Sequence, residues 1–322
     1  MRNIIIIFII TVLSSSLQSQ EQLNIVASAS MLQDIASRVI GSDQDIKMIV
    51  PIGGDPHLHE PTPSNARLVA GADLILINGL TFEGWINELI DNSGTTGKVL
   101  TVTKGVDVLG SQVYKNSKDP HAWMDASNGI IYARNVRDAM IELDPANQDK
   151  YNLNYSEYEK ELHELDEEIT AAIKTIPEER RILITSHDAF QYFGRRYGIQ
   201  LEAIMGISTE AEAQTADIIR VNKVIKERKV PAVFIESTIN PKMVQQMAKD
   251  NNVKVGGSLY ADSLGDKDSP AATYVEMLRY NTRTIVAALS GNLIEHKDEH
   301  AQDASPAGTN WPMLGLIFGI LI

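Results

Sequence analysis

The sequence predicts an α/β protein of two lobes, each built on a parallel sheet, with one long rigid helix joining them. Short β-rich runs alternate with helical patterns along most of the chain, which is typical of β-α units. In the middle of the chain, over residues 149–176, the pattern changes to apolar residues at spacings of three and four. That periodicity indicates one amphipathic helix, which is long enough to bridge two lobes.

The N-terminal half follows the β-α pattern, with turn residues between its elements. Gly41 and Gly71 follow helical patterns and are expected to end them, and Pro51 ends the second strand. The strand at 74–77 is apolar throughout, which indicates burial on both faces of the sheet. The expected elements of this half are a strand at 23–27, a helix at 31–40, a strand at 46–50, a short helix capped by Ser64, a strand at 74–77 and a helix at 127–143.

The long helix at 149–176 contains no Gly or Pro and would extend about 39 Å. Pro177 ends this helix, and the β-α alternation then resumes. Gly198 and Gly291 are expected to end two of the later helices. The expected elements after Pro177 are a strand at 182–185, a helix at 189–197, a strand at 232–235, a helix at 241–251, a strand at 253–255 and a helix at 270–289. The chain therefore divides into an N-terminal lobe at 20–148, the linking helix at 149–176 and a C-terminal lobe at 177–291.

Both ends of the chain carry apolar segments that are too short to span a bilayer as helices. At the N-terminus, Arg2 precedes the apolar run 4–13, and residues 1–19 have the pattern of a secretory signal peptide. At the other end, residues 292–322 form a polar linker and an apolar tail, and the tail at 311–322 would reach about 18 Å as a helix. We expect an exported protein in the periplasm, with weak membrane association through the tail as an open alternative.

The composition excludes several classes of function. The chain has 29 Lys and Arg against 42 Asp and Glu, which gives a net charge of −13. This acidic field repels phosphate backbones, so we expect no nucleic-acid binding, and it favours cations. The sequence contains no cysteine, which excludes a disulfide scaffold, thiolate metal sites, thiol catalysis and a lipid-modified cysteine.

Three of the seven histidines lie in suggestive positions. His57 and His121 each follow an Asp-Pro pair, and His187 comes directly after the strand at 182–185. Asp262 follows another strand-like segment. Open α/β sheets bind ligands at the carboxyl ends of their strands, so these four groups are candidates for one site. Three imidazoles and a carboxylate suit a divalent metal, zinc above all. The alternative of ordinary core or surface histidines stays open, because the spacings match no short metal motif.

Other titratable residues are weaker candidates. His163 falls within the long helix and is expected on its solvated face, and His296 and His300 lie in the polar C-terminal segment. Glu236 ends a strand, where it could orient a ligand or have a structural role. None of these residues is expected to hold the metal.

Several short motifs occur in order along residues 23–289. They are Gly54-Asp55-Pro56-His57, Glu60-Pro61-Thr62-Pro63, Ala72-Asp73-Leu74, Asn78-Gly79, Asp119-Pro120-His121-Ala122-Trp123, Ser186-His187-Asp188-Ala189-Phe190, Glu236-Ser237-Thr238 and Asp262-Ser263-Leu264. In this order they resemble the zinc- and manganese-binding solute-binding proteins of ABC importers, the TroA- and ZnuA-like group. The resemblance implies two Rossmann-like lobes, a metal in the cleft between them, and ligands at His57, His121, His187 and Asp262.

The resemblance also implies a function. The protein would be a periplasmic receptor that captures Zn2+, with Mn2+ as the second candidate, and delivers it to an ABC permease of the inner membrane with its separate ATPase. It would be a monomer and not an enzyme. His187 stands where manganese-preferring members often have glutamate, which favours zinc. The long His-rich loop of many zinc members is missing, with only His59 and Glu60 beside His57, which weakens a zinc-only specificity. A metal-dependent surface adhesin and a zinc hydrolase are the alternatives.

Overall fold

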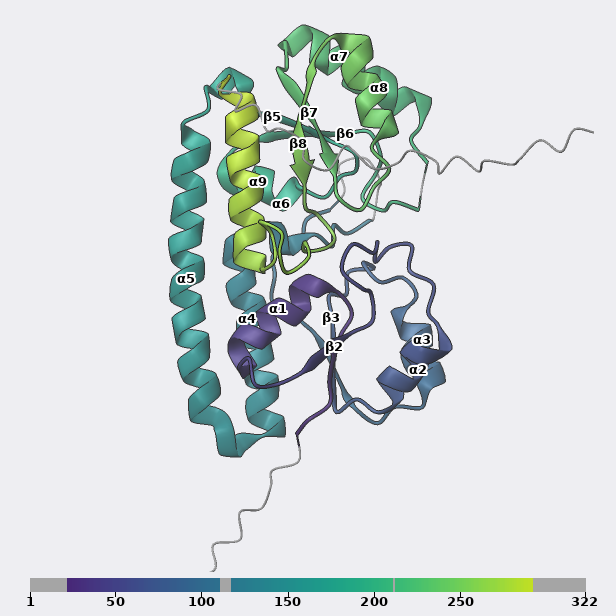
Figure 1. Cartoon of the computed structure of the whole chain (residues 1–322), viewed down its shortest axis with the longest axis vertical. Helices are drawn as coiled ribbons and strands as arrows, with labels where there is room; N and C mark the ends of the chain where they lie inside the picture. Colours follow the sequence, from purple (N-terminus) through teal and green to yellow (C-terminus); the bar gives the residue numbers. More distant parts are fainter. Residues whose placement is uncertain (1–21, 111–116, 211, 292–322) are drawn as a thin grey trace, which may run out of the picture.

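The computed structural model describes residues 22–110, 117–210 and 212–291. Two α/β lobes lie one above the other, and the long helix α5 (Gln148–Lys174) runs beside both of them (Figure 1). Every pair of neighbouring strands in the described part is parallel, as the sequence predicts. The expected signal peptide and the apolar tail lie outside the described residues. No helix within the described ranges is both long and apolar enough to cross a membrane.

The N-terminal lobe is a four-stranded sheet in the order β2-β1-β3-β4, with helices on both faces. Its strands are β1 (Ile25–Ala27), β2 (Ile46–Met48), β3 (Leu74–Ile77) and β4 (Lys98–Thr101). Its helices are α1 (Ser30–Ile40), α2 (Pro63–Ala70), α3 (Ile86–Ser93) and α4 (Ala126–Leu143). Alternate residues of a strand point to opposite faces. Ile25 and Leu74 therefore join the core with α1 and α4, whereas Val26 and Ile75 pack with α2 and α3.

The C-terminal lobe contains two pairs of parallel strands, β5-β6 and β7-β8, with β5 beside β7. Its strands are β5 (Ile182–Thr185), β6 (Gln200–Ala203), β7 (Ala232–Glu236) and β8 (Lys254–Leu259). Its helices are α6 (Gln191–Tyr197), α7 (Thr215–Arg228), α8 (Lys242–Asn251) and α9 (Tyr274–Leu289). The carboxyl ends of the parallel strands β7 and β8 point toward the N-terminal lobe (Figure 1).

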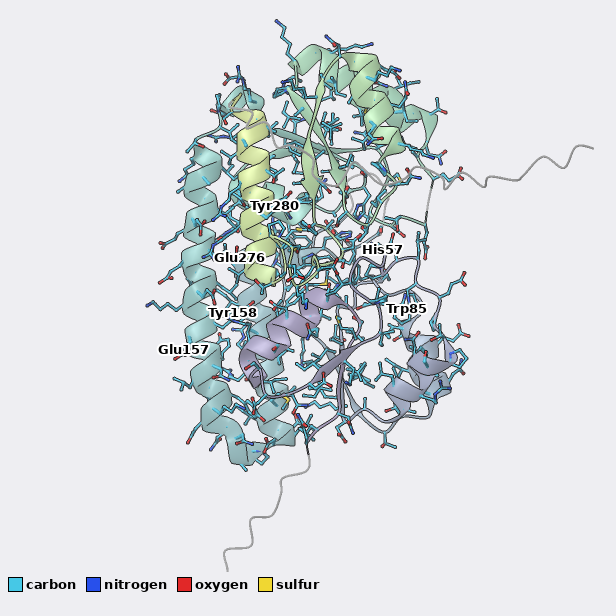
Figure 2. All side chains as sticks on the ribbon, viewed as in Figure 1. His57, Trp85, Glu157, Tyr158, Glu276 and Tyr280 are labelled. Atoms are coloured by element: carbon cyan, nitrogen blue, oxygen red, sulfur yellow. The ribbon has the colours of Figure 1, made fainter. Side chains whose placement is uncertain are left out.

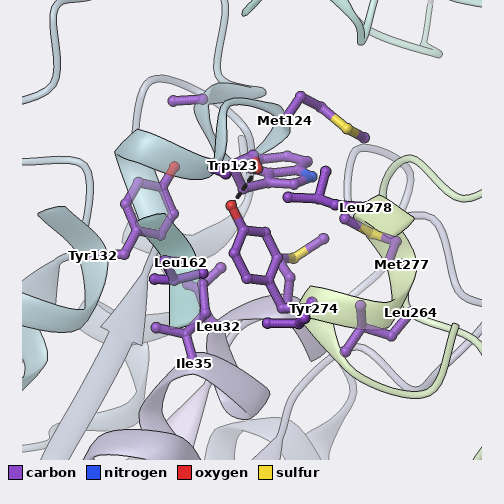
Figure 3. Packing of buried hydrophobic residues seen from close by; sticks show 14 of the residues in the cluster. Leu32, Ile35, Trp123, Met124, Tyr132, Leu162, Leu264, Tyr274, Met277 and Leu278 are labelled. Atoms are coloured by element: carbon purple, nitrogen blue, oxygen red, sulfur yellow. Dashed lines mark hydrogen bonds between the residues drawn. The ribbon is translucent and has the colours of Figure 1, made fainter. Parts of the chain in front are cut away.

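Helix α5 packs against α1 and α4 of the N-terminal lobe and against α6 and α9 of the C-terminal lobe. Its buried stripe has the predicted spacing and is formed by Tyr151, Tyr155, Tyr158, Leu162, Leu165, Ile169 and Ile173. One apolar cluster runs through both lobes and includes Trp123 and Tyr274, whose hydroxyl donates to the Trp123 carbonyl at 2.6 Å (Figure 3). Because this core is continuous, the lobes cannot separate widely without exposing apolar surface.

Some element boundaries differ from the expected ones for local reasons. Thr62, and not Ser64, caps α2: its side chain accepts from the Asn65 backbone, and Pro63 occupies the first turn. Helix α9 begins at Tyr274 and not at residue 270, because Thr273 is its cap. The elements α3, β4, β6 and α7 were not predicted from the sequence. Helix α3 and strands β4 and β6 have only four to eight residues, and most residues of β4, β6 and α7 are partly exposed.

Candidate metal centre

Four side chains from four separate loops meet between the two lobes. His57 lies in the loop between β2 and α2, and His121 immediately precedes the short 3-10 turn at Ala122–Met124. His187 follows β5 by two residues, and Asp262 follows β8. One possible ligand atom from each lies within 4.8 Å of all the others. Figure 2 shows His57 between the lobes, on the side away from α5.

The nitrogen atoms that face one another are closely spaced. Nε2 of His121 lies 3.3 Å from Nε2 of His57 and 3.4 Å from Nε2 of His187. The Asp262 carboxylate completes the group, with 3.2 Å from Oδ2 to Nε2 of His187 and 3.4 Å from Oδ1 to Nε2 of His121. The exposed fraction is 5% for His57 and 1% or less for the other three residues. The structure thus brings all four residues predicted from the sequence into one buried cluster.

A carboxylate and a set of backbone contacts hold His121 in place. Asp119 accepts from both the backbone nitrogen of His121, at 2.9 Å, and its ring nitrogen Nδ1, at 2.8 Å. Asn78 donates to the carbonyl of Pro120, the residue before His121, at 3.0 Å. With Nδ1 engaged in this way, Nε2 is the atom that faces the cluster.

The two groups from the C-terminal lobe are held in a similar way. Nδ1 of His187 lies 2.6 Å from Oε2 of Glu236, and the backbone nitrogen of His187 donates to Oε1 of the same carboxylate at 2.9 Å. The indole of Trp123 donates to the carbonyl of Ala261 at 3.0 Å, which positions the adjacent Asp262. Glu236 therefore holds both the backbone and the ring of His187.

His57 has a different environment. Its backbone nitrogen donates to Oδ1 of Asp55 at 2.9 Å, in the same turn that Asp119 makes with His121. Its ring packs edge-on against Phe82 with 5.0 Å between ring centroids. The signal for the two aspartates was present in the sequence, because Asp two residues before a turn residue often accepts from that residue's backbone. Both Asp-Pro-His motifs thus contain a signal for this turn, which was not predicted from the sequence.

Burial and neighbouring charges give the two histidines of the N-terminal lobe very different pKa values. Burial lowers the pKa of His57 to about 3. Burial also acts against protonation of His121, but hydrogen bonds to Asp119 and Asp262 outweigh it and raise the pKa of His121 to about 9. In the absence of a metal, the His57 ring is therefore neutral at pH 7, whereas the His121 ring is protonated on both nitrogens and positively charged.

The C-terminal-lobe groups behave as a charged pair. Burial disfavours the charged form of His187, but the Glu236 and Asp262 carboxylates raise its pKa well above the usual value. Burial likewise disfavours ionised Asp262, but the nearby imidazoles, His187 first, hold its pKa well below the usual range. An incoming cation must displace protons from two imidazoles, so ion and protons compete for the same nitrogen atoms.

The cluster has the chemistry of a cation site. Both carboxylate oxygens of Asp262 are buried, and they face the Nε2 atoms of His121 and His187. Buried carboxylate oxygens are costly unless a cation or a donor satisfies them. A divalent ion among three imidazole nitrogens and this carboxylate would satisfy all four groups.

The remaining histidines stay outside the cluster. His163 is exposed on α5, as expected. His59 packs against Trp85 with 4.9 Å between ring centroids and contacts Asn65 at 3.2 Å. His296 and His300 lie outside the described residues.

A known protein family and individual proteins resemble this chain over most of its length. The family described as "Zinc-uptake complex component A periplasmic" (ZnuA) matches residues 25–288. The manganese-binding lipoprotein MntA of Halalkalibacterium halodurans is 36% identical over 270 residues, which cover 84% of this chain and 89% of MntA. The manganese ABC transporter substrate-binding lipoprotein PsaA of Streptococcus pneumoniae is 32% identical over 285 residues, which cover 86% of this chain and 92% of PsaA.

Solved structures resemble this chain over the same span. The periplasmic zinc-binding protein TroA of Treponema pallidum superposes with a TM-score of 0.79 and 32% identity, covering 84% of this chain and 99% of TroA. The manganese-bound periplasmic metal-binding protein of Candidatus Liberibacter asiaticus gives a TM-score of 0.76 and 30% identity, covering 82% and 98% of the two chains.

Proposed function

This chain belongs to the ZnuA family of periplasmic zinc-uptake components, and from that premise we propose that it captures Zn2+ at His57, His121, His187 and Asp262. It is a metal-binding component of an ABC importer and not an enzyme. The observation that carries the proposed site is the convergence of three imidazole nitrogens and one carboxylate in a buried cluster. The hydrolase expected as an alternative is excluded by family membership.

The spacing of the donor atoms supports a small tetrahedral ion. Zinc lies 2.0–2.1 Å from its nitrogen ligands, so ligand atoms at the corners of a tetrahedron are about 3.3 Å apart. Four of the distances among the candidate donor atoms are 3.2, 3.3, 3.4 and 3.4 Å, with the two to Asp262 measured from its two different oxygens, and one atom of each residue lies within 4.8 Å of the others. Four protein donors would complete a tetrahedral zinc site.

The donor set favours zinc over manganese. Imidazole suits zinc, whereas carboxylates, carbonyls and water suit manganese, and affinity for one site rises from Mn2+ to Zn2+. Some of the relatives named above are manganese-binding proteins, so Mn2+ is the second candidate cargo. We propose that Mn2+ binds the same four residues more weakly than Zn2+.

Capture and release follow from the ligands and the fold. The acidic chain attracts the cation, and the four donors replace its hydration shell as protons leave His121 and His187. The chain delivers the ion to the permease of the importer, and the separate ATPase supplies the energy for transport. Because α5 and the continuous core join the lobes, we propose that release uses local movement of the ligand loops and not wide separation of the lobes.

We further propose that the mature protein is a periplasmic monomer that does not bind nucleic acid. Several relatives are named lipoproteins, yet the 322 residues contain no cysteine that could carry a lipid. The net charge of −13 disfavours contact with phosphate backbones.

Titration calorimetry and metal analysis of the purified protein test the proposed site. We expect one Zn2+ per chain at pH 7, bound more tightly than Mn2+. Affinity should fall as the pH decreases from about 9, because His121 then takes up a proton that the ion must displace. A folded protein that binds no divalent ion at neutral pH would overturn the proposal.

A further inference from the structure

The loop that carries His57 is attached to the opposite lobe at two points. Gly53 donates through its backbone nitrogen to Oγ of Ser263, next to Asp262, at 2.8 Å. The hydroxyl of Thr209 donates to Oδ2 of Asp55 at 2.7 Å. Both bonds join the N-terminal lobe to loops of the C-terminal lobe that hold or adjoin the other ligands. The His57 loop belongs to the N-terminal lobe and is thus also held by the C-terminal lobe.

The Thr209 bond links His57 to the loop of His187 through a short chain of contacts. Oδ1 of Asp55 accepts from the backbone of His57, while Oδ2 of the same carboxylate accepts from Thr209. Thr209 follows β6, and the segment just before it is tied to the His187 loop, because the backbone of Asp188 donates to the carbonyl of Gly206 at 3.1 Å. One side chain, Asp55, therefore connects ligand loops of the two lobes.

The two Asp-Pro-His motifs differ in how they use their aspartate. Asp119 contacts the ring of its own histidine, His121, and so fixes that imidazole directly. Asp55 instead directs its second oxygen across the cleft. Within the described ranges no carboxylate contacts the His57 ring, so the position of this ligand depends on its loop and on the bonds that hold the loop.

We infer that Thr209 is a positioning residue for His57, and that its bond to Asp55 keeps the bound ion from leaving. When this bond breaks, the His57 loop loses one of its two attachments to the C-terminal lobe, and His57 becomes the first ligand to leave the ion. The inference rests on the proposed metal site. It assigns release to the His57 side of the cluster, whereas His121 and His187 remain held by Asp119 and Glu236.

Rates of zinc release from three proteins test this inference. Zn2+-loaded wild type, Thr209→Val and Thr209→Ser are each mixed with an excess of a chromophoric chelator in a stopped-flow instrument. Valine has nearly the shape of threonine but lacks the hydroxyl, so release should be about tenfold faster or more. Serine retains the hydroxyl and should release zinc at a rate within about twofold of the wild type.

A double variant shows whether the effect passes through Asp55. If the bond is the cause, adding Thr209→Val to Asp55→Ala should change the release rate little beyond Asp55→Ala alone. Independent, multiplying effects would overturn the inference, as would equal release rates for wild type and Thr209→Val. A Thr209→Ser variant as fast as Thr209→Val would overturn it too. Failure of the wild type to bind zinc would instead refute the proposed function, before any variant is compared.

Discussion

The carboxylate of Glu236 provides the sharpest test of how the site selects its ligand atoms. We consider Glu236→Gln, which keeps the shape of the side chain and removes its charge. In the wild type, Oε1 of the carboxylate accepts a hydrogen bond from the backbone nitrogen of His187, and Oε2 lies 2.6 Å from Nδ1 of the same residue. Both groups are buried, so the replacement amide cannot turn toward water.

The size of the effect follows from the hydrogen positions. The backbone N–H of His187 is a fixed donor, so the single amide oxygen of glutamine should stay on it at the 2.9 Å position. The amide NH2 then faces Nδ1, which must accept, and the ring proton moves to Nε2, the atom that would bind the ion. Removing such an orienting partner lowers metal affinity about 10–100-fold, or about 1.4–2.8 kcal/mol.

Competition titration with a zinc indicator at pH 7 measures the dissociation constants of wild type and Glu236→Gln. Glu276→Gln is the matched control, because it removes the same charge from a side chain that is 46% exposed and pairs with Arg279 and not with a proposed ligand. Thermal unfolding without metal checks that both variants fold. Equal zinc affinity for wild type and a folded Glu236→Gln would refute the reasoning that Glu236 sets the tautomer of His187.

Three further predictions concern the ligands and the stability of the fold. His121→Ala should abolish high-affinity zinc binding, whereas His163→Ala should leave it intact, because His163 is exposed on α5. Calorimetry that finds equal zinc affinities for the two variants would contradict the assignment of His121. His187→Glu should shift the ratio of the zinc and manganese dissociation constants toward manganese, because a carboxylate oxygen replaces an imidazole nitrogen, although zinc should still bind more tightly. Competition titration with both metals measures that ratio, and an unchanged ratio would show that position 187 does not tune selectivity. Burial raises the pKa of Asp34 to about 6, so its ionised form destabilises the folded protein at neutral pH. The contribution of Asp34 to stability should therefore rise as the pH falls from about 6 to about 4. Asp34→Asn should be more stable at pH 7 by up to about 3 kcal/mol, a gain that denaturant unfolding should find lost below pH 4.

Much of the fold was predictable because its signals are local. The stripe of α5 and the apolar run of β3 depend on residues three to four positions apart or adjacent, and both appear in the structure where the periodicity places them. Elements with weak periodicity, such as β6 and α7, were missed, because their burial depends on neighbours distant in sequence. The cap of α2 was misplaced by two residues, since Thr62 and Ser64 are equally suitable in isolation.

The sequence by itself determined which groups could bind a cation: histidines and an aspartate at strand ends, in an acidic chain without cysteine. Only the tertiary structure decided that their donor atoms lie within 4.8 Å of one another, and that Asp119 and Glu236 contact the rings while Asp55 reaches Thr209. The physical reason is distance along the chain. Asp55 and Thr209 are 154 positions apart, and such contacts arise from the packing of the lobes and not from any local pattern.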